Sequence, residues 1–247
     1  MLTQGVSNLI ILRIVCLAKI LLVCCLLGPA ALAQSTMMNA PSSDVVAAKK
    51  VYLEMDFITN YAWAQGDDRF ANYLPRAVVG VGRNVEVGVN FSYTHTPVGG
   101  EPMEIQPNAK WQFYNNEGKG VAAAAGCMFF IPITNRAGTD TFAQCYSVAS
   151  KQFSGNYGPK FTGGGYRLIG AGPDEETKTG VIAGYEQPLT QRLSFIVDWQ
   201  SGNNRLGYIS PSLNLSTPRN GNLSGGYAIA NQGRGRNWLF FFYGQQF

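Results

Sequence analysis

Stretches in which apolar and polar residues strictly alternate are the feature that most constrains the fold of this chain. The clearest are residues 51–61, 85–94, 103–113 and 193–200, and each has one apolar and one polar face. A period of two residues is typical of a β-strand, because successive side chains point to opposite faces. Most of these stretches run to about ten residues, longer than the five or six of an average strand in a globular sheet and close to the length of a strand that crosses a membrane.

Clusters of Gly, Pro, Asn and Asp separate the alternating stretches at eleven places between residues 65 and 235, so we expect about twelve strands. Every second connection, beginning with Gly82–Asn84, is expected to be short, which is typical of the periplasmic turns of an outer-membrane barrel. The sequence therefore predicts an all-β fold, a transmembrane antiparallel up-and-down β-barrel of about 12 strands spanning residues 50–247. A soluble secreted β-protein is the alternative.

Composition excludes two other classes of protein. A bundle of membrane helices needs several apolar runs of about 20 residues, and only the first 33 residues contain anything close to one. Disorder is disfavoured, because 46% of the residues are hydrophobic and 12% are aromatic. The 29 glycines and the low charged fraction of 14% indicate an ordered, glycine-rich and charge-poor architecture.

Residues 1–33 have the pattern of a secretory signal peptide. Positive charge at Arg13 and Lys19 precedes the short apolar run Ile20–Leu27, and Ala31–Ala33 forms an A-x-A cleavage site. A membrane-anchoring helix is the alternative, although the run is too short to span a bilayer. We expect residues 34–49 to form a flexible N-terminal lead, and the nearly balanced charge of the mature chain predicts no nucleic-acid partner.

The end of the chain carries a specific aromatic pattern. Alternate positions on one face are filled by Leu239, Phe241, Tyr243 and Phe247, with Gln245 as the interruption. This pattern resembles the C-terminal assembly signal of bacterial outer-membrane barrels, which ends in Phe or Trp. It predicts that the barrel-assembly machinery is a partner, together with the lipid and lipopolysaccharide of a Gram-negative outer membrane.

Several segments together resemble the outer-membrane family described as meta-pathway phenol-degradation proteins or transporters. The resemblance lies in residues 77–89, 105–113, 184–194 and 207–211 and in the final strand. It implies a channel or transporter for passive or facilitated uptake of small solutes, including hydrophobic ones, and it brings no catalytic residues. Aromatic residues expected at inward positions, such as Trp238 and Tyr208, would also suit aromatic solutes. The alternative is a structural or surface-interaction barrel with a closed lumen.

The alternation also predicts which side chains face the lumen. About twelve strands should leave a narrow lumen, and a charge on the lipid face is costly, so the polar set is placed inside. These side chains either form a constriction that selects solutes or merely form ion pairs in the lumen, and the aromatic ones either line a solute path or fill space. The lumen candidates are Glu54, Asp56, Arg76, Glu86, Glu104, Lys110, Glu186, Asp198, Tyr208 and Trp238. A first turn centred near residue 66 would place Asp56 opposite Arg76.

Cys127 and Cys145 are the two cysteines outside the signal segment, and they are symmetrically placed about residue 136. Antiparallel pairing would place them opposite each other, so we predict a cross-strand disulfide, with two free thiols as the alternative. The single histidine, His95, has no serine with a supporting motif nearby, so we expect no enzymatic activity. One histidine and two cysteines do not supply a metal site, and no cofactor is expected.

Overall fold

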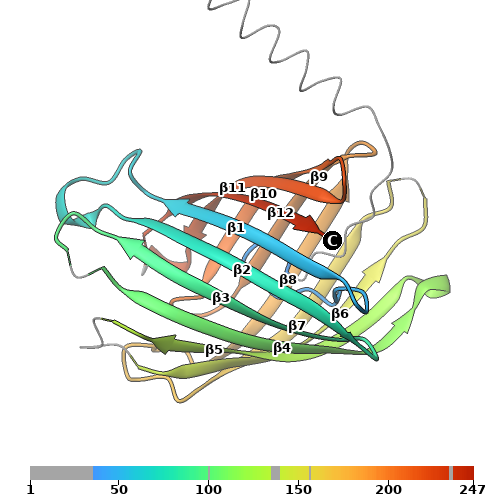
Figure 1. The fold of residues 1–247 in the computed structure, drawn as a ribbon, viewed down its shortest axis with the longest axis horizontal. Helices are drawn as coiled ribbons and strands as arrows, with labels where there is room; N and C mark the ends of the chain where they lie inside the picture. Colours follow the sequence, from blue (N-terminus) through green and yellow to red (C-terminus); the bar gives the residue numbers. More distant parts are fainter. Residues whose placement is uncertain (1–35, 100, 135–139, 156, 234–235) are drawn as a thin grey trace, which may run out of the picture.

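Twelve antiparallel strands close into one barrel in the computed structural model, which describes residues 36–99, 101–134, 140–155, 157–233 and 236–247. Each strand pairs with its neighbours in the sequence, and the last pairs with the first, as Figure 1 shows. The strands are β1 (Val51–Thr59), β2 (Ala71–Gly82), β3 (Val85–His95), β4 (Met103–Asn116), β5 (Val121–Pro132), β6 (Phe142–Gln152), β7 (Lys160–Ile169), β8 (Thr179–Pro188), β9 (Leu193–Gln200), β10 (Tyr208–Thr217), β11 (Gly221–Ala230) and β12 (Trp238–Gln246). The predicted antiparallel up-and-down barrel of 12 strands is confirmed.

Helical structure is limited to three short 3₁₀ turns among the described residues, at Gly66–Asp68, Glu117–Lys119 and Asn231–Gly233. Within the part of the chain that the structure describes, no helix has the length and apolarity needed to cross a membrane. The predicted signal peptide, residues 1–33, lies outside the described residues.

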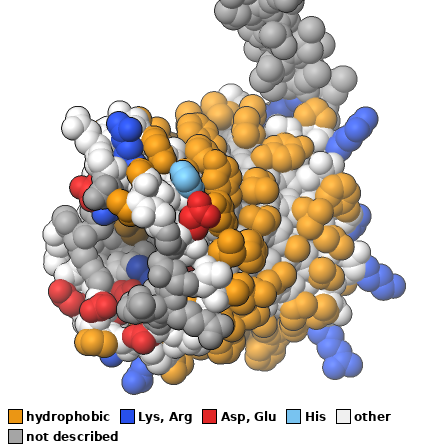
Figure 2. All heavy atoms as spheres, turned by 60° about the vertical axis from the view of Figure 1, so that its left-hand side comes forward, with side chains coloured by type: hydrophobic (Ala, Val, Ile, Leu, Met, Phe, Trp, Pro, Cys, Tyr) orange, Lys and Arg blue, Asp and Glu red, His pale blue; other side chains and the backbone are white. Residues whose placement is uncertain are grey.

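The barrel separates the two faces of its strands by residue parity. Nearly all buried strand residues have even numbers, whereas the large apolar residues left exposed on the strands, such as Leu53, Val87 and Phe241, have odd numbers. Figure 2 shows apolar side chains as a broad band across the face of the barrel in view, with charged side chains mainly beyond the edges of the band. The parity holds round the barrel because residues paired between neighbouring strands are, almost everywhere, both odd or both even.

Connections at the two ends of the barrel differ in length, as expected. One end carries the shorter connections, 83–84, 117–120, 153–159, 189–192 and 218–220, and the other carries 60–70, 96–102, 133–141, 170–178, 201–207 and 231–237. We call these the short-turn end and the long-loop end. Strand β1 starts and β12 finishes at the short-turn end, and the mark C in Figure 1 shows the chain end there.

The tightest connection needs an unusual backbone conformation. Both residues of the Arg83–Asn84 turn have positive φ, 53° and 58°. Two successive left-handed residues are typical of a two-residue hairpin turn whose twist matches that of the strands. A bulge between Trp111 and Tyr114 shifts the β4–β5 register, and Tyr114, although even-numbered, is 45% exposed.

Residues 36–46, most of the expected N-terminal lead, lie inside the barrel, and Ala47 and Ala48 are exposed where the chain reaches the wall. Met37, Met38, Ala40 and Val46 are each at most 2% exposed, and the first three belong to the main apolar cluster of the interior. We call residues 36–48 the plug segment. The sequence left open whether the lead enters the lumen, and the structure places it there.

Candidate functional site: the lumen and its plug segment

The plug segment folds back on itself inside the lumen. Thr36 forms an antiparallel bridge with Pro41, and the N–H of Met37 donates to the carbonyl of Ala40 at 2.9 Å. Residues 37–40 therefore make a tight turn, which we call the tip. Beyond Pro41 the chain continues toward the start of β1 at the short-turn end.

Asp198, on β9, holds the tip by its main chain. Its Oδ2 atom accepts hydrogen bonds from the N–H groups of Met38, Asn39 and Ala40 at 2.8, 2.7 and 2.8 Å. Asp198 is only 1% exposed. Hydrogen bonds to a carboxylate are about twice as strong as those between neutral groups. Three of them offset much of the desolvation cost of a buried carboxylate.

Further side chains of the barrel wall contact the main chain of the plug segment. Gln200 donates to the carbonyl of Asn39 at 3.1 Å, and Gln112 donates to the carbonyl of Ser43 at 2.9 Å. Glu86 accepts the N–H of Val46 at 2.7 Å. These contacts come from β3, β4 and β9, so strands on different sides of the barrel hold one segment.

The root of the plug segment is a short parallel bridge between Ala48 and Gly80 of β2. The N–H of Lys49 donates to the Gly80 carbonyl at 2.8 Å, and the N–H of Gly80 donates to the Lys50 carbonyl at 3.0 Å. A Cβ atom at position 80 would lie 2.1 Å from the carbonyl oxygen of Ala47. Only glycine allows the segment to approach the wall this closely.

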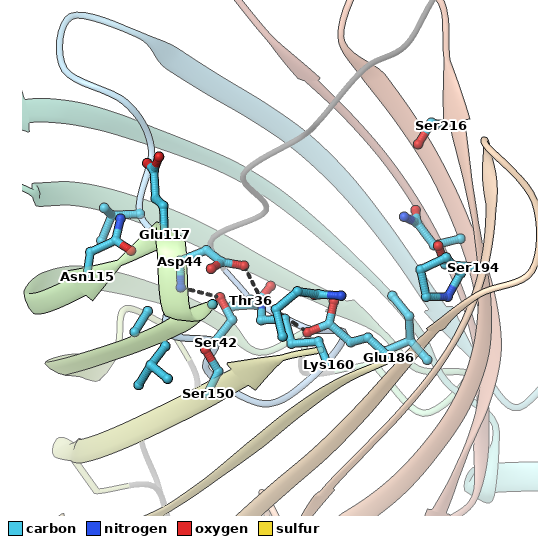
Figure 3. Close-up of a pocket in the computed structure, with 18 of the residues that line it drawn as sticks. Thr36, Ser42, Asp44, Asn115, Glu117, Ser150, Lys160, Glu186, Ser194 and Ser216 are labelled. Atoms are coloured by element: carbon cyan, nitrogen blue, oxygen red, sulfur yellow. Dashed lines mark hydrogen bonds and ion pairs between the residues drawn. The ribbon is translucent and has the colours of Figure 1, made fainter. Parts of the chain in front are cut away.

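Ion pairs link the plug segment to the short-turn end of the lumen. Lys160 Nζ lies 2.5 Å from Asp44 of the plug and 3.2 Å from Glu186 of β8. Figure 3 shows these three side chains converging from the plug, β7 and β8. Nearby, Lys110 pairs with Glu86 at 3.1 Å. Asp44, Lys160 and Glu186 border a cavity of about 780 Å³ at the short-turn end. The lining of this cavity also includes Thr36, Ser42, Gln112 and Ser194.

A second ion cluster lies on the wall formed by β1 and β2. Arg76 Nη1 is 2.8 Å from Glu54 and 3.4 Å from Asp56. The strand register places Arg76 directly opposite Glu54, whereas Asp56 is opposite Leu74. The expected pairing of Asp56 opposite Arg76 is therefore wrong by two residues, because the first turn is centred one residue earlier than expected. The shift leaves both carboxylates inside, and Arg76 still reaches both.

A smaller cavity of about 150 Å³ lies between the tip and this cluster. Its polar lining residues include Asp56, Arg76 and Asn90, and its apolar lining residues include Phe130 and Phe242. Asp56 Oδ1, Arg76 Nε and Asn90 Oδ1 have no hydrogen-bond partner among the described residues. Buried polar atoms normally have partners, so this cavity has unused hydrogen-bonding capacity.

A loop covers the lumen at the long-loop end. Arg205, in the β9–β10 connection, forms a two-pronged ion pair with Glu104 of β4 at 3.0 and 3.1 Å. Its guanidinium also lies 4.8 Å from the ring centre of Phe130 and 5.3 Å from that of Phe142. The ion pair and the cation–π contacts hold the connection across the mouth.

Tyr208 of β10 and three aromatic side chains of the last strand form a continuous series of ring contacts on the inner wall, which we call the aromatic stack. Ring centres are 5.2 Å apart for Tyr208 and Trp238, 5.7 Å for Trp238 and Phe240, and 4.8 Å for Phe240 and Phe242. Phe240 and Phe242 are almost completely buried and share the interior cluster with the two methionines of the tip. Part of this stack therefore packs against the plug segment.

Two predicted features lie on the outer face. Cys127 of β5 is directly opposite Cys145 of β6, and a disulfide joins them, with the Cα atoms 4.1 Å apart. The other is the aromatic pattern of β12, in which Phe241 and Tyr243 are exposed beside Leu239. Phe247 contributes to the pairing of the last strand with the first, because its N–H donates to the Val51 carbonyl at 2.8 Å.

His95 lies at the end of β3, where its Nδ1 atom is 3.1 Å from Glu101. Hydrogen bonds from Tyr93 and from His95 lower the pKa of Glu101 below its usual value. Among the described residues, no group of His, Cys, Asp and Glu side chains is arranged to hold a metal ion. The geometry at His95 is that of an ordinary hydrogen bond at the surface.

All ten lumen candidates face inward in the structure, but they divide into separate groups. Glu86, Glu186 and Asp198 lie against or near the plug segment. Lys110 pairs with Glu86 and also donates to the Ser42 carbonyl of the plug segment at 3.5 Å. The other groups are the Arg76 cluster, the Glu104–Arg205 pair and the aromatic pair Tyr208 and Trp238. The sequence reasoning missed Arg205 and the plug residues, because a loop arginine and a run of small residues are common on any protein surface.

Comparisons with known proteins identify the fold. No family model matches the chain, and no curated protein matches it in sequence. Among solved structures it is similar to an outer membrane channel from Pseudomonas putida F1, with a TM-score of 0.51 and 10% identity over 82% of this chain and 97% of that one. A KdgM porin in complex with disordered oligogalacturonate gives a TM-score of 0.49 at 7% identity, over 80% and 98% of the two chains. At this level of identity the likeness shows the barrel fold alone.

Proposed function

We propose that this protein is an outer-membrane channel of a Gram-negative bacterium that takes up small solutes through its lumen. The observation that carries the proposal is the separation of faces in a closed barrel. Exposed apolar side chains cover the outer wall, and carboxylates, amides and cations line the inner wall. A soluble barrel would have the opposite arrangement, with apolar side chains inside and polar ones outside.

The two cavities mark the solute path. One opens at the short-turn end, the other lies nearer the long-loop end, and Thr36 of the plug segment borders both. Conduction through this lumen requires movement of the plug segment or of the loop that carries Arg205. We therefore propose a channel that is closed in the described conformation and opens when one of these two elements moves.

The proposed solutes are small and include hydrophobic or aromatic ones. The resemblance of the sequence to the meta-pathway phenol-degradation family supports this class, as does the aromatic stack from Tyr208 to Phe242. The 150 Å³ cavity is lined by both aromatic and polar side chains, and a cavity of about that volume holds a molecule the size of benzene.

The proposed setting follows from the outer surface. The apolar band would contact membrane lipid, and the charged loops at the long-loop end would contact lipopolysaccharide. The exposed stripe of Leu239, Phe241 and Tyr243 would be recognised by the barrel-assembly machinery. Residues 1–33 would act as the export signal, which leaves residues 34–49 as the N-terminal lead and 50–247 as the barrel.

Planar-bilayer recordings of the refolded protein test the channel function. We expect rare openings of the wild type and frequent openings of a variant with a loosened plug segment, with small aromatic and polar solutes acting as blockers. Glu101→Gln, an exposed loop substitution, is the control that should leave the current unchanged. Absence of current from correctly folded wild type and variant alike would contradict the proposal.

A structural or surface-interaction barrel with a closed lumen is the second candidate. The double closure favours it, because the plug segment crosses the lumen and Arg205 holds a loop over the mouth. The two candidates differ in one result. A structural barrel would remain non-conducting after both closures have been weakened.

A further inference from the structure

The inner wall binds the plug segment largely by groups that every peptide has. Asp198 accepts three consecutive main-chain N–H groups, and Glu86 accepts a fourth, that of Val46. Gln200 and Gln112 donate to two main-chain carbonyls, those of Asn39 and Ser43. These six contacts would be available to any chain of suitable shape.

Side-chain contacts of the segment are fewer and fall at separate points. Asn39 donates to Ser210 at 2.8 Å, Ser43 and Ser150 share a hydrogen bond of 2.5 Å, and Asp44 pairs with Lys160. Met37 and Met38 are the only large apolar side chains at the tip, and both are buried in the apolar cluster of the interior. The wall therefore holds two apolar side chains beside a tight turn and contacts the other side chains of the segment only at separate points.

The charge at Asp198 narrows the class of ligand. Three consecutive N–H groups in a turn form a concave site for an anion, and the carboxylate of Asp198 is the anion that the tip binds. Without those donors a buried carboxylate has a large desolvation cost. A sugar hydroxyl or a simple cation could reach Asp198, but neither offers three N–H donors together with carbonyls for Gln200 and Gln112.

We propose that the lumen is a binding site for short peptides, recognised through the main chain of a turn with two adjacent apolar side chains. Residues 36–48 occupy this site in the same chain, and a free peptide of the same kind occupies it when they leave. The inference names a ligand class for the proposed channel and rests on it only in requiring that solutes reach the lumen. Binding to the detergent-solubilised protein does not require conduction, so the two proposals can fail separately.

The first experiment uses the full chain with a weakened plug segment and an intact wall. Ala40→Pro and Val46→Pro remove two bonded N–H groups, and Asp44→Asn weakens the ion pair with Lys160. The probe is a fluorescent synthetic peptide with the sequence of residues 36–48, and its binding is measured by anisotropy in detergent. We expect at least tenfold tighter apparent binding to this triple variant than to the wild type, whose site is occupied.

Two matched comparisons test recognition through the main chain. Probe N-methylated at Asn39 and Ala40 should bind the triple variant at least tenfold more weakly, whereas N-methylation at Val45, whose N–H does not contact the described wall residues, should change binding less than threefold. Adding Asp198→Asn to the triple variant should weaken binding at least tenfold. Adding Glu101→Gln, a carboxylate outside the lumen, should leave binding unchanged.

Equal binding of the two methylated probes would overturn the inference, as would undetectable binding to a folded triple variant. If the triple variant does not fold, Gly80→Ala in the full chain serves instead, because it disturbs only the root of the plug segment. A barrel that conducts ions after plug weakening but does not bind the peptide would overturn this inference and leave the channel function standing.

Discussion

Replacing Gly80 with alanine should release the root of the plug segment while leaving the twelve hydrogen-bonded strands of the barrel intact. The added Cβ atom would lie 2.1 Å from the Ala47 carbonyl oxygen and 2.4 Å from that of Val46. Both neighbours are main-chain atoms, so they cannot rotate away as the end of a side chain can. Ala47 and Ala48 of the plug segment are exposed, whereas β2 is held by a strand on each side, so the plug segment is the part that moves.

The size of the effect follows from the packing and the hydrogen bonds at Gly80. Overpacking at a close contact costs about 1–3 kcal/mol, and each of the two hydrogen bonds between Gly80 and residues 49–50 contributes a net amount of about 0.5–1.5 kcal/mol. If only the packing cost acts on the equilibrium, the population with a displaced plug segment rises by about 5- to 150-fold. Loss of the hydrogen bonds would increase this factor.

Open probability in planar bilayers, together with limited proteolysis at residues 36–48, measures the displaced population. Gly163→Ala is the matched control, because Gly163 is also a strand glycine and its added Cβ would meet no atom within 4 Å. The reasoning is refuted if Gly80→Ala and Gly163→Ala give the same open probability and the same protease resistance as the wild type.

Three further predictions concern the mouth, the ion cluster and the disulfide. Arg205→Ala should raise single-channel current by freeing the β9–β10 connection, and Arg205→Lys should restore closure only in part because lysine cannot make the two-pronged contact with Glu104. Identical currents in the wild type and both variants would argue against this closure. Arg76→Gln should lower the free energy of unfolding by about 3–5 kcal/mol, since it leaves Glu54 buried without its cation, and an unchanged urea midpoint would disprove the claim. Replacing both Cys127 and Cys145 with alanine should lower the free energy of unfolding by about 3 kcal/mol, because the disulfide closes a loop of this length. Two thiols found by alkylating the denatured, unreduced wild type would show that the disulfide is absent.

Strand number and strand faces were predictable because each depends on local sequence. Alternation in a stretch such as 85–94 predicts both the strand and its two faces. The assignment of each side chain to a face is strongly specified, because one face meets apolar surroundings and the other polar ones. Tyr114 shows where this reasoning stops. A bulge inserts a residue before it and reverses its face, and nothing in the local alternation marks the position.

Register was less predictable than strand face. An error of one residue in the centre of a turn moves each cross-strand partner by two residues, which is why Asp56 was expected opposite Arg76 and Glu54 is found there. A two-residue slip keeps every side chain on its own face, so the hydrophobic pattern could not detect the error.

The plug segment could not be predicted because its partners are scattered along the chain. Asp198 lies about 160 residues from the tip that it binds, and Glu86 lies 40 residues from Val46. Bonds to main-chain groups select no particular side chain, so a run such as Pro41–Ala48 has the composition of a linker. The contacts of Arg205 could not be predicted either, because its partners are also scattered along the chain, on β4, β5 and β6.

The attachment of the plug segment to the wall at Gly80 sets how the barrel responds to concentration. A segment tethered by so short a piece of chain is present at its own site at an effective concentration of about millimolar, whatever the amount of protein in the membrane. A free ligand has to reach a comparable concentration, or bind more tightly than residues 36–48 do, before it displaces them. A lumen closed in this way responds to a ligand that is abundant or binds tightly, and it does not respond to traces of a weakly binding one.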